Sequence, residues 1–267
     1  METNIIIGNL LAVLVGITLG LIGSGGSILS VPILVYVMHV EPALATAYSL
    51  FAVGTTALFG GFQKAKQKLV DFKKVFLFGI PTIFSVFITR KIIVPSIPDV
   101  IFSTPTFTLH KPVLIMIVFS IVMIMASVRM IKPLKEKITN DDESLNYKGI
   151  FFQGIIIGLV AGFVGAGGGF LIIPALLFFA KTPMKMAVGT SLFIIAAQSL
   201  IGFTGDISNG NLLDWNLLLT FTFCSVIGIF IGNYLSKKFS GEKLKTGFGW
   251  FVLAMGIYII LKELLFK

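Results

Sequence analysis

Two short runs of glycine and small polar residues are the parts of this sequence best suited to bind a small molecule. The first is Gly23-Ser24-Gly25-Gly26-Ser27, and the second is Gly165-Ala166-Gly167-Gly168-Gly169. Consecutive glycines can turn several backbone N–H groups toward one concavity, and a helix that begins just after them adds partial positive charge. Glycine suits this role because it adopts positive φ values and has no Cβ to hold a ligand away. These residues predict the binding of a small anion.

Hydroxyl and amide side chains on the apolar segments that follow could complete the site. A hydroxyl in an apolar helix either bonds to its own helix or donates to a ligand, and both alternatives stay open for Ser49 and Ser191. Gln198 is the most polar of these residues, and its amide needs a partner. The predicted substrate-binding residues are Gly23, Ser24, Gly25, Gly26, Ser27, Thr46, Ser49, Gly165, Gly167, Gly168, Gly169, Thr190, Ser191 and Gln198.

The two glycine runs belong to a duplicated sequence. Their surroundings align at one constant spacing, as shown by the pairs Gly20 and Gly162, Gly23 and Gly165, Pro32 and Pro174, Ser49 and Ser191, and Gly60 and Gly202. After a single gap the alignment resumes, and Leu69-Val70-Asp71-Phe72 falls on Leu212-Leu213-Asp214-Trp215. We predict a first membrane repeat over residues 1–131, a polar linker over 132–148 and a second membrane repeat over 149–267.

The composition is that of an integral membrane protein. Of the 267 residues, 56% are hydrophobic and 12% are charged, and the mean hydropathy is +0.99, whereas about a quarter of the residues of a soluble protein are charged. The apolar runs are long enough to cross a hydrocarbon core of about 30 Å. We predict an all-α polytopic protein of the plasma (cell) membrane, with about eight apolar helices plus Gly-broken or re-entrant segments.

The glycine runs must break the apolar segments in which they lie. The stretch 5–38 is too long for one ordinary helical crossing, and we expect a helix over 5–22 followed by a shorter apolar piece over 28–38. Backbone groups that a break leaves unpaired are tolerated in a membrane only where they are buried in protein or line a wet cavity. Paired broken segments in two halves are typical of a transporter's binding site, which we expect where the two breaks meet.

The lysines indicate how the two halves lie in the bilayer. The loop over 63–74 carries five lysines, whereas its counterpart over 204–214 carries none and contains Asp206 and Asp214. Cytoplasmic loops are enriched in lysine and arginine, so we expect the first loop inside the cell and the second outside. Matching loops on opposite faces favour inverted repeats, with a parallel repeat as the alternative. The same location of the lysines in short loops argues against nucleic-acid binding, despite the net charge of +9.

The sequence lacks the residues that several classes of function require. Arg90 and Arg129 fall at the ends of spans, where we interpret them as snorkelling to the interface. Cys224 is the single cysteine, so it forms no internal disulfide, and no pair of carboxylates or metal-ligand spacing stands out. The glycine runs lack the Gly-Lys-Ser/Thr ending of a phosphate-binding loop. We therefore predict no enzyme, no cofactor and no metal site, and we expect the segment 94–111 to be an irregular loop.

The doubled pattern of a glycine run, a proline and a helix of small residues resembles the sulfite exporter TauE/SafE family over nearly the whole chain. The residues that carry the resemblance are Gly23-Ser24-Gly25-Gly26-Ser27, Pro32 and Ala45-Thr46-Ala47-Tyr48-Ser49-Leu50, repeated as Gly165-Ala166-Gly167-Gly168-Gly169, Pro174 and Ala187-Val188-Gly189-Thr190-Ser191-Leu192. The resemblance implies a permease for sulfite, an organosulfonate or a related sulfur-containing or carboxylate anion. Tyr48 stands where the second half has Thr190, which leaves the identity of the substrate open.

We accordingly expect a secondary transporter of a small anion that works by alternating access. A passive anion channel and a non-transporting membrane assembly factor are the alternatives. The expected partners are the anionic substrate and the lipid bilayer. A proton and a sodium ion stay open as coupling ions, and a homo-oligomer stays open as the assembly.

Overall fold

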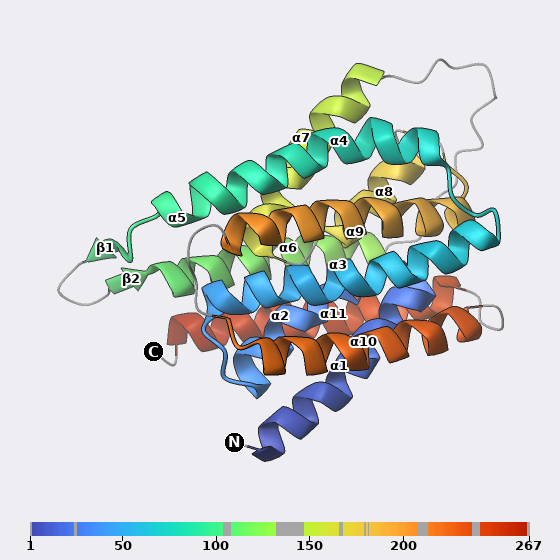
Figure 1. The fold of residues 1–267 in the computed structure, drawn as a ribbon. Helices are drawn as coiled ribbons and strands as arrows, with labels where there is room; N and C mark the ends of the chain where they lie inside the picture. Colours follow the sequence, from blue (N-terminus) through green and yellow to red (C-terminus); the bar gives the residue numbers. More distant parts are fainter. Residues whose placement is uncertain are drawn as a thin grey trace.

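The protein is a bundle of α-helices (Figure 1). The computed structural model describes residues 2–23, 26–103, 108–131, 147–165, 168–178, 180, 182–207, 213–236 and 241–265. Within these residues, six helices are long and apolar enough to cross a membrane, and two shorter apolar helices cover 28–37 and 149–164. The prediction of an all-α polytopic membrane protein is confirmed. The predicted linker falls mostly outside the described residues.

The helices follow the expected order along the chain. Those before the linker are α1 (Glu2–Ile22), α2 (Ser27–Pro32), the π-helix η1 (Ile33–Val37), α3 (Pro42–Lys66), α4 (Phe72–Ile88), the π-helix η2 (Thr89–Ile93), α5 (Val94–Ser96) and α6 (Lys111–Ile131). Those after it are α7 (Tyr147–Val164), α8 (Gly169–Phe178), α9 (Met184–Ile207), α10 (Trp215–Leu235) and α11 (Gly241–Leu265).

Acidic residues set where three of these helices begin. The carboxylate of Glu41 accepts from the backbone N–H of Leu44 before α3, and that of Asp71 accepts from the N–H of Lys74 in α4. Asp214 does the same before α10. The first N–H groups of a helix have no partner within it, so a side-chain acceptor just before the first turn stabilises the helix at that register.

The segment between α5 and α6 differs from the irregular loop that we expected. Strand β1 (Val100–Ser103) pairs with strand β2 (Thr108–His110) in an antiparallel hairpin, with Val100 opposite His110. Val100, Ile101 and Phe102 have side chains that fit a pleated surface better than a coil, which favours the strand. The expectation of an irregular loop is therefore wrong for these residues.

Helices α3 and α9 form the centre of the bundle (Figure 1). They are the two most buried of the six long helices, with 67% and 72% of their apolar windows inside the protein. Gly61 of α3 faces Phe193 of α9, and Gly54 faces Leu200, so the two helices run antiparallel. Helix α4 packs beside α9, and α10 packs beside α3.

Glycines let the remaining helices pack closely in pairs around this centre. Helix α1 packs on α10, α7 packs on α4, and α6 packs on α11. A Cβ added to Gly20 of α1 would lie 2.7 Å from the backbone nitrogen of Asn233 in α10, and one added to Gly158 of α7 would lie 2.6 Å from the carbonyl oxygen of Thr82 in α4. Without a hydrophobic effect between them in lipid, helices associate through such close backbone packing.

Candidate functional site

The first glycine run lies where α1 ends, next to the beginning of α9. Gly23 has a φ of 80°, which favours glycine, and a Cβ added to it would lie 2.6 Å from the side chain of Val188. The hydroxyl of Ser191 bonds to the carbonyl oxygen of Val188 at 2.9 Å and lies 3.4 Å from that of Gly23. Ser191 therefore bonds to its own helix and to the break. Ser24 and Gly25 lie outside the described residues, and Ser27 is the first residue of α2.

The second glycine run lies where α7 ends, next to the beginning of α3. Gly165 has a φ of 71°, and a Cβ added to it would collide with Thr46. Gly168 has a φ of 57° and faces Gln198 in the middle of α9. Gly167 lies outside the described residues, and Gly169 begins α8. Three predicted residues, Gly165, Gly168 and Thr46, are thus gathered around this break, with Gln198 beyond them.

The two breaks lie toward opposite ends of the bundle. Gly23 packs near the beginning of α9, and Gly165 packs near the beginning of α3. Because α3 and α9 run antiparallel, their beginnings are at opposite ends. The ends of α1 and α7 therefore lie apart, but the short helices that follow the breaks, α2 and α8, contact each other, so the expected junction stays a prediction. Each break also contacts a central helix, because Gly23 packs on α9 and Gly165 packs on α3.

Some of the glycines are needed for packing. A Cβ at Gly26 would meet the carbonyl oxygen of Val15 and would lie 2.6 Å from the hydroxyl of Thr18, both on α1. A Cβ at Gly168 would lie 2.5 Å from that of Ala161 on α7. These glycines let the short helices α2 and α8 fold back onto α1 and α7, so their presence has a structural reason whether or not an anion contacts them.

The interface of α3 with α9 contains buried polar side chains. Ser49 shares a hydrogen bond with Ser30 of α2, and both side chains are fully buried. Gln198 is also fully buried. Within the described residues, the hydroxyls of Thr56 and Ser199 have no hydrogen-bond partner, although both side chains are fully buried. A buried polar group without a partner costs free energy, which a bound ligand or water can recover. The predicted set omits Thr56 and Ser199.

Tyr48 and Thr190 occupy aligned positions in the sequence, and their hydroxyls accept equivalent hydrogen bonds. The hydroxyl of Tyr48 accepts from the backbone N–H of Asp214, and that of Thr190 accepts from the N–H of Asp71 at 3.0 Å. Each therefore fixes the beginning of α10 or α4 to a central helix. The contact explains why both positions carry a hydroxyl, and it gives Thr190 a structural partner.

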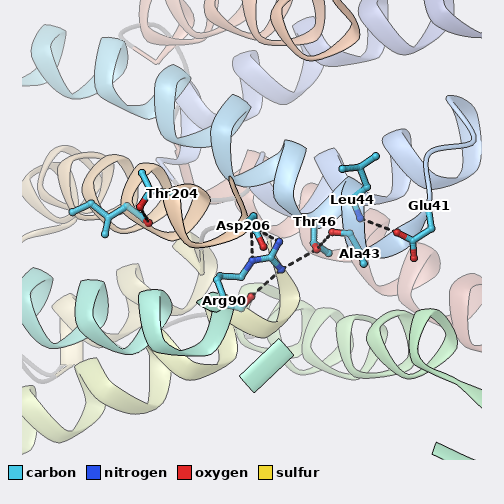
Figure 2. A network of polar contacts seen from close by, with 9 residues as sticks. Glu41, Ala43, Leu44, Thr46, Arg90, Thr204 and Asp206 are labelled. Carbon is cyan, nitrogen blue, oxygen red and sulfur yellow. Dashed lines mark hydrogen bonds and ion pairs between the residues drawn. The ribbon is translucent and has the colours of Figure 1, made fainter. Parts of the chain in front are cut away.

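A charged network lies beside the second break (Figure 2). The Arg90 guanidinium donates from Nε to Oδ2 of Asp206 at 2.8 Å, and its Nη2 lies 2.6 Å from the same oxygen. Nη1 donates to the Thr46 hydroxyl at 3.0 Å and to the carbonyl oxygen of Gly162 at 3.4 Å. The side chain of Arg90 is 1% exposed, and that of Asp206 is 6% exposed. This is a buried ion pair that joins η2 to α9.

Sequence reasoning missed this pair. We interpreted Arg90 as snorkelling to the interface, and we placed Asp206 in a polar loop. The interpretation of Arg90 is wrong because its side chain is buried, and Asp206 lies in the last turn of α9. The aligned sequences contained a signal that could have found the pair. When the alignment of Asp71 with Asp214 is extended in both directions without a further gap, Arg90 aligns with Asn233, and Asp206 aligns with Gln63. All four of these paired side chains are polar.

The aligned residues also contact each other in the structure. Nδ2 of Asn233 donates to Oε1 of Gln63, which joins α10 to α3 beside the first half's break. Gly20, three residues before Gly23, packs on the backbone of Asn233. Each break is therefore accompanied by one polar pair, and the pair is ionic at the second break and neutral at the first.

Comparison with known proteins agrees with this architecture. Residues 9–259 match the profile of the family described as Sulfite exporter TauE/SafE. A Probable membrane transporter protein of Xylella fastidiosa (strain 9a5c) is 29% identical over 254 residues, which cover 92% of this chain and 91% of that protein. The Probable membrane transporter protein YunE of Bacillus subtilis is 26% identical over 271 residues, which cover 94% and 93%. No solved structure matches the chain.

Proposed function

Because the chain belongs to the TauE/SafE sulfite exporter family, we propose that it is a secondary transporter that moves a small anion across the cell membrane by alternating access. It is a multi-pass membrane protein of a transporter family and not an enzyme. The proposed substrate is sulfite, an organosulfonate or a related sulfur-containing or carboxylate anion. A proton or a sodium ion is the proposed coupling ion.

The observation that carries the mechanism is the exchange of packing partners between the two halves. Helix α1 packs on α10, whereas α7 packs on α4, and the matching helices α3 and α9 pack antiparallel on each other. A twofold axis in the membrane plane would exchange α1 with α7 and α10 with α4, and it would bring α3 against α9. Inverted repeats of this kind support alternating access, because one arrangement can face either side of the membrane.

The exchange extends to single residues. Gly16 packs on Ser225 and Gly228, whereas Gly158 packs on Thr82 and Ser85. Gly16 and Gly158 have the same spacing as Gly20 and Gly162, and the residues that they contact have the same spacing as Asp71 and Asp214. The agreement between aligned positions and spatial contacts supports the division into repeats over 1–131 and 149–267.

The interface of α3 with α9 is the proposed location of the substrate. It lies between the two halves, where transporters of this architecture bind their substrates near the bilayer midplane. The buried hydroxyls of Thr56 and Ser199 offer hydrogen bonds there, and the buried side chain of Gln198 lies on the same helix as Ser199. The predicted glycines of both runs would border this path, and the contact between α2 and α8 supports a site where the two broken segments meet.

The orientation in the membrane follows from the lysines. We propose that the end of α3 and the turn after it, with Lys64, Lys66 and Lys68, face the cytoplasm and that the segment with Asn211 faces outside. Single cysteines at Lys66 and Asn211 in a Cys224→Ser background should then differ in intact cells. An impermeant thiol reagent should label only the cysteine at position 211, and labelling of both positions would argue against inversion.

Flux measurements separate the proposed transporter from its alternatives. Proteoliposomes that contain the purified protein would be tested with sulfite, sulfate, sulfonates and carboxylates, with and without imposed proton or sodium gradients. We expect saturable, gradient-coupled flux of at least one anion. Non-saturating conductance would indicate a channel, and the absence of flux for all of these anions would indicate the assembly factor.

A further inference from the structure

Burying the ion pair of Arg90 with Asp206 costs more free energy than burying a neutral polar pair that would join the same helices. Moving two charges out of water carries a large desolvation penalty, which their attraction does not always repay. At the matching place in the other half, Asn233 and Gln63 join the corresponding helices without charge. Since a neutral pair can tie these helices together, the charge of Arg90 needs a functional explanation.

The position of Arg90 suggests that function. Its guanidinium bonds to the carbonyl oxygen of Gly162, three residues before the break at Gly165, and to the hydroxyl of Thr46, on which Gly165 packs. The residue itself lies in the π-helix η2, an irregularity that is frequent at functional sites. Arg90 also lies within the candidate membrane span Phe72–Ser96, and an ionisable side chain buried in such a span commonly marks a substrate pathway.

We propose that Arg90 binds the transported anion and that the carboxylate of Asp206 occupies the place of the anion in the substrate-free state. The proposal rests on the proposed function. A guanidinium presents a planar fork of N–H donors that matches two oxygens of a carboxylate, and the oxygens of a sulfite or sulfonate group fit the same fork. In the structure, Oδ2 of Asp206 accepts from Nε and lies against Nη2, so one carboxylate covers this fork.

Thr46 holds the guanidinium in position during this exchange. Its hydroxyl donates to the carbonyl oxygen of Ala43 at 2.7 Å, and the same oxygen accepts from Nη1 of Arg90 (Figure 2). Nη1 of the guanidinium therefore stays bonded to Thr46 while Nε and Nη2 exchange the Asp206 carboxylate for the transported anion. Substrate and Asp206 compete for one cation, which predicts that the removal of the Asp206 charge tightens substrate binding.

The test measures binding of sulfite and methanesulfonate to the purified full chain by calorimetric titration. Asp206→Asn should bind at least one of these anions several-fold more tightly than the wild type, because the competing carboxylate is gone. The double variant Arg90→Asn with Asp206→Gln copies the Asn233 and Gln63 pair into this place. It should bind about tenfold to a hundredfold more weakly, as expected for the loss of a charged hydrogen-bond partner.

The control removes a different buried cation. Lys64 is 7% exposed, and its ammonium donates to Ser236 near the ends of α3 and α10. Lys64→Gln removes one buried cation, as the double variant does at Arg90, and should leave affinity within about twofold. An equal loss of affinity in Lys64→Gln would overturn the assignment to Arg90.

The outcomes separate this proposal from the proposed function. If the wild type transports an anion and the folded double variant binds it with unchanged affinity, Arg90 is not the binding cation. If the double variant does not fold, Asp206→Asn alone decides, and unchanged or weaker binding overturns the competition. A wild type that neither binds nor transports any tested anion would instead overturn the proposed function.

Discussion

Replacing Gly16 with alanine should force α1 away from α10 and destabilise the folded protein by about 1–3 kcal/mol, the usual cost of overpacking. The added Cβ would collide with the carbonyl oxygen of Ser225 and would lie 2.9 Å from the Cα of Gly228. Both obstacles are backbone atoms, which cannot rotate away as a side chain can. Gly158→Ala should act in the same direction, because its Cβ would lie 2.6 Å from the carbonyl oxygen of Thr82.

Gly247 provides the matched control for this prediction. It lies in α11, and among the described residues a Cβ added to it would meet no atom within 4 Å beyond the neighbouring backbone of its own helix. Gly247→Ala should leave stability unchanged or raise it by up to about 1 kcal/mol, since alanine favours the helix. Folded yield and thermal unfolding of the detergent-purified variants measure both effects. Equal melting temperatures for Gly16→Ala and the wild type would contradict the close packing of α1 on α10.

Replacing Arg90 with glutamine should destabilise the protein by about 3–5 kcal/mol, the cost of leaving one partner of a buried pair uncompensated. Asp206 would keep a carboxylate that is 6% exposed, without the guanidinium that now faces it. Thr46 and the carbonyl oxygen of Gly162 would each lose a donor as well. Thermal unfolding in detergent measures the change.

The same double variant that tests anion binding serves as the control for stability. Arg90→Asn with Asp206→Gln removes both charges together, so it should recover most of the loss, as Asn233 and Gln63 do at the other end. A single variant Arg90→Gln as stable as the wild type would show that the ion pair does not form in the membrane protein. A double variant less stable than Arg90→Gln would show that the neutral pair is no substitute here.

Much of the fold could be predicted from the sequence because membrane helices have a strong signal. The expected span over 215–235 coincides with α10, and the expected span over 149–164 falls within α7. The length of an apolar run and the charges at its ends determine such segments with little help from tertiary contacts. The hairpin of β1 and β2 was missed, because two strands of three and four residues carry almost no periodic signal.

The candidate site was only partly predictable, since its residues depend on distant partners. Arg90 at the end of an apolar run has the same sequence signature whether it snorkels or is buried. Asp206, which decides between the two, lies 116 residues away along the chain. The glycines are ambiguous in the same way, because two different roles require glycine at one position. The close packing of α2 on α1 requires a glycine at Gly26, and direct contact between the backbone and an anion would require one there as well.

Counterflow in the proteoliposomes tests the central claim of anion transport by alternating access most directly. Vesicles loaded with unlabelled sulfite, or with the best substrate of the flux panel, would be diluted into the same anion carrying a radiolabel. A transporter whose single site faces one side at a time should accumulate label transiently above its equilibrium level, with a rate that saturates. Vesicles that only equilibrate the label, with a rate proportional to concentration, would contradict alternating access and indicate a channel.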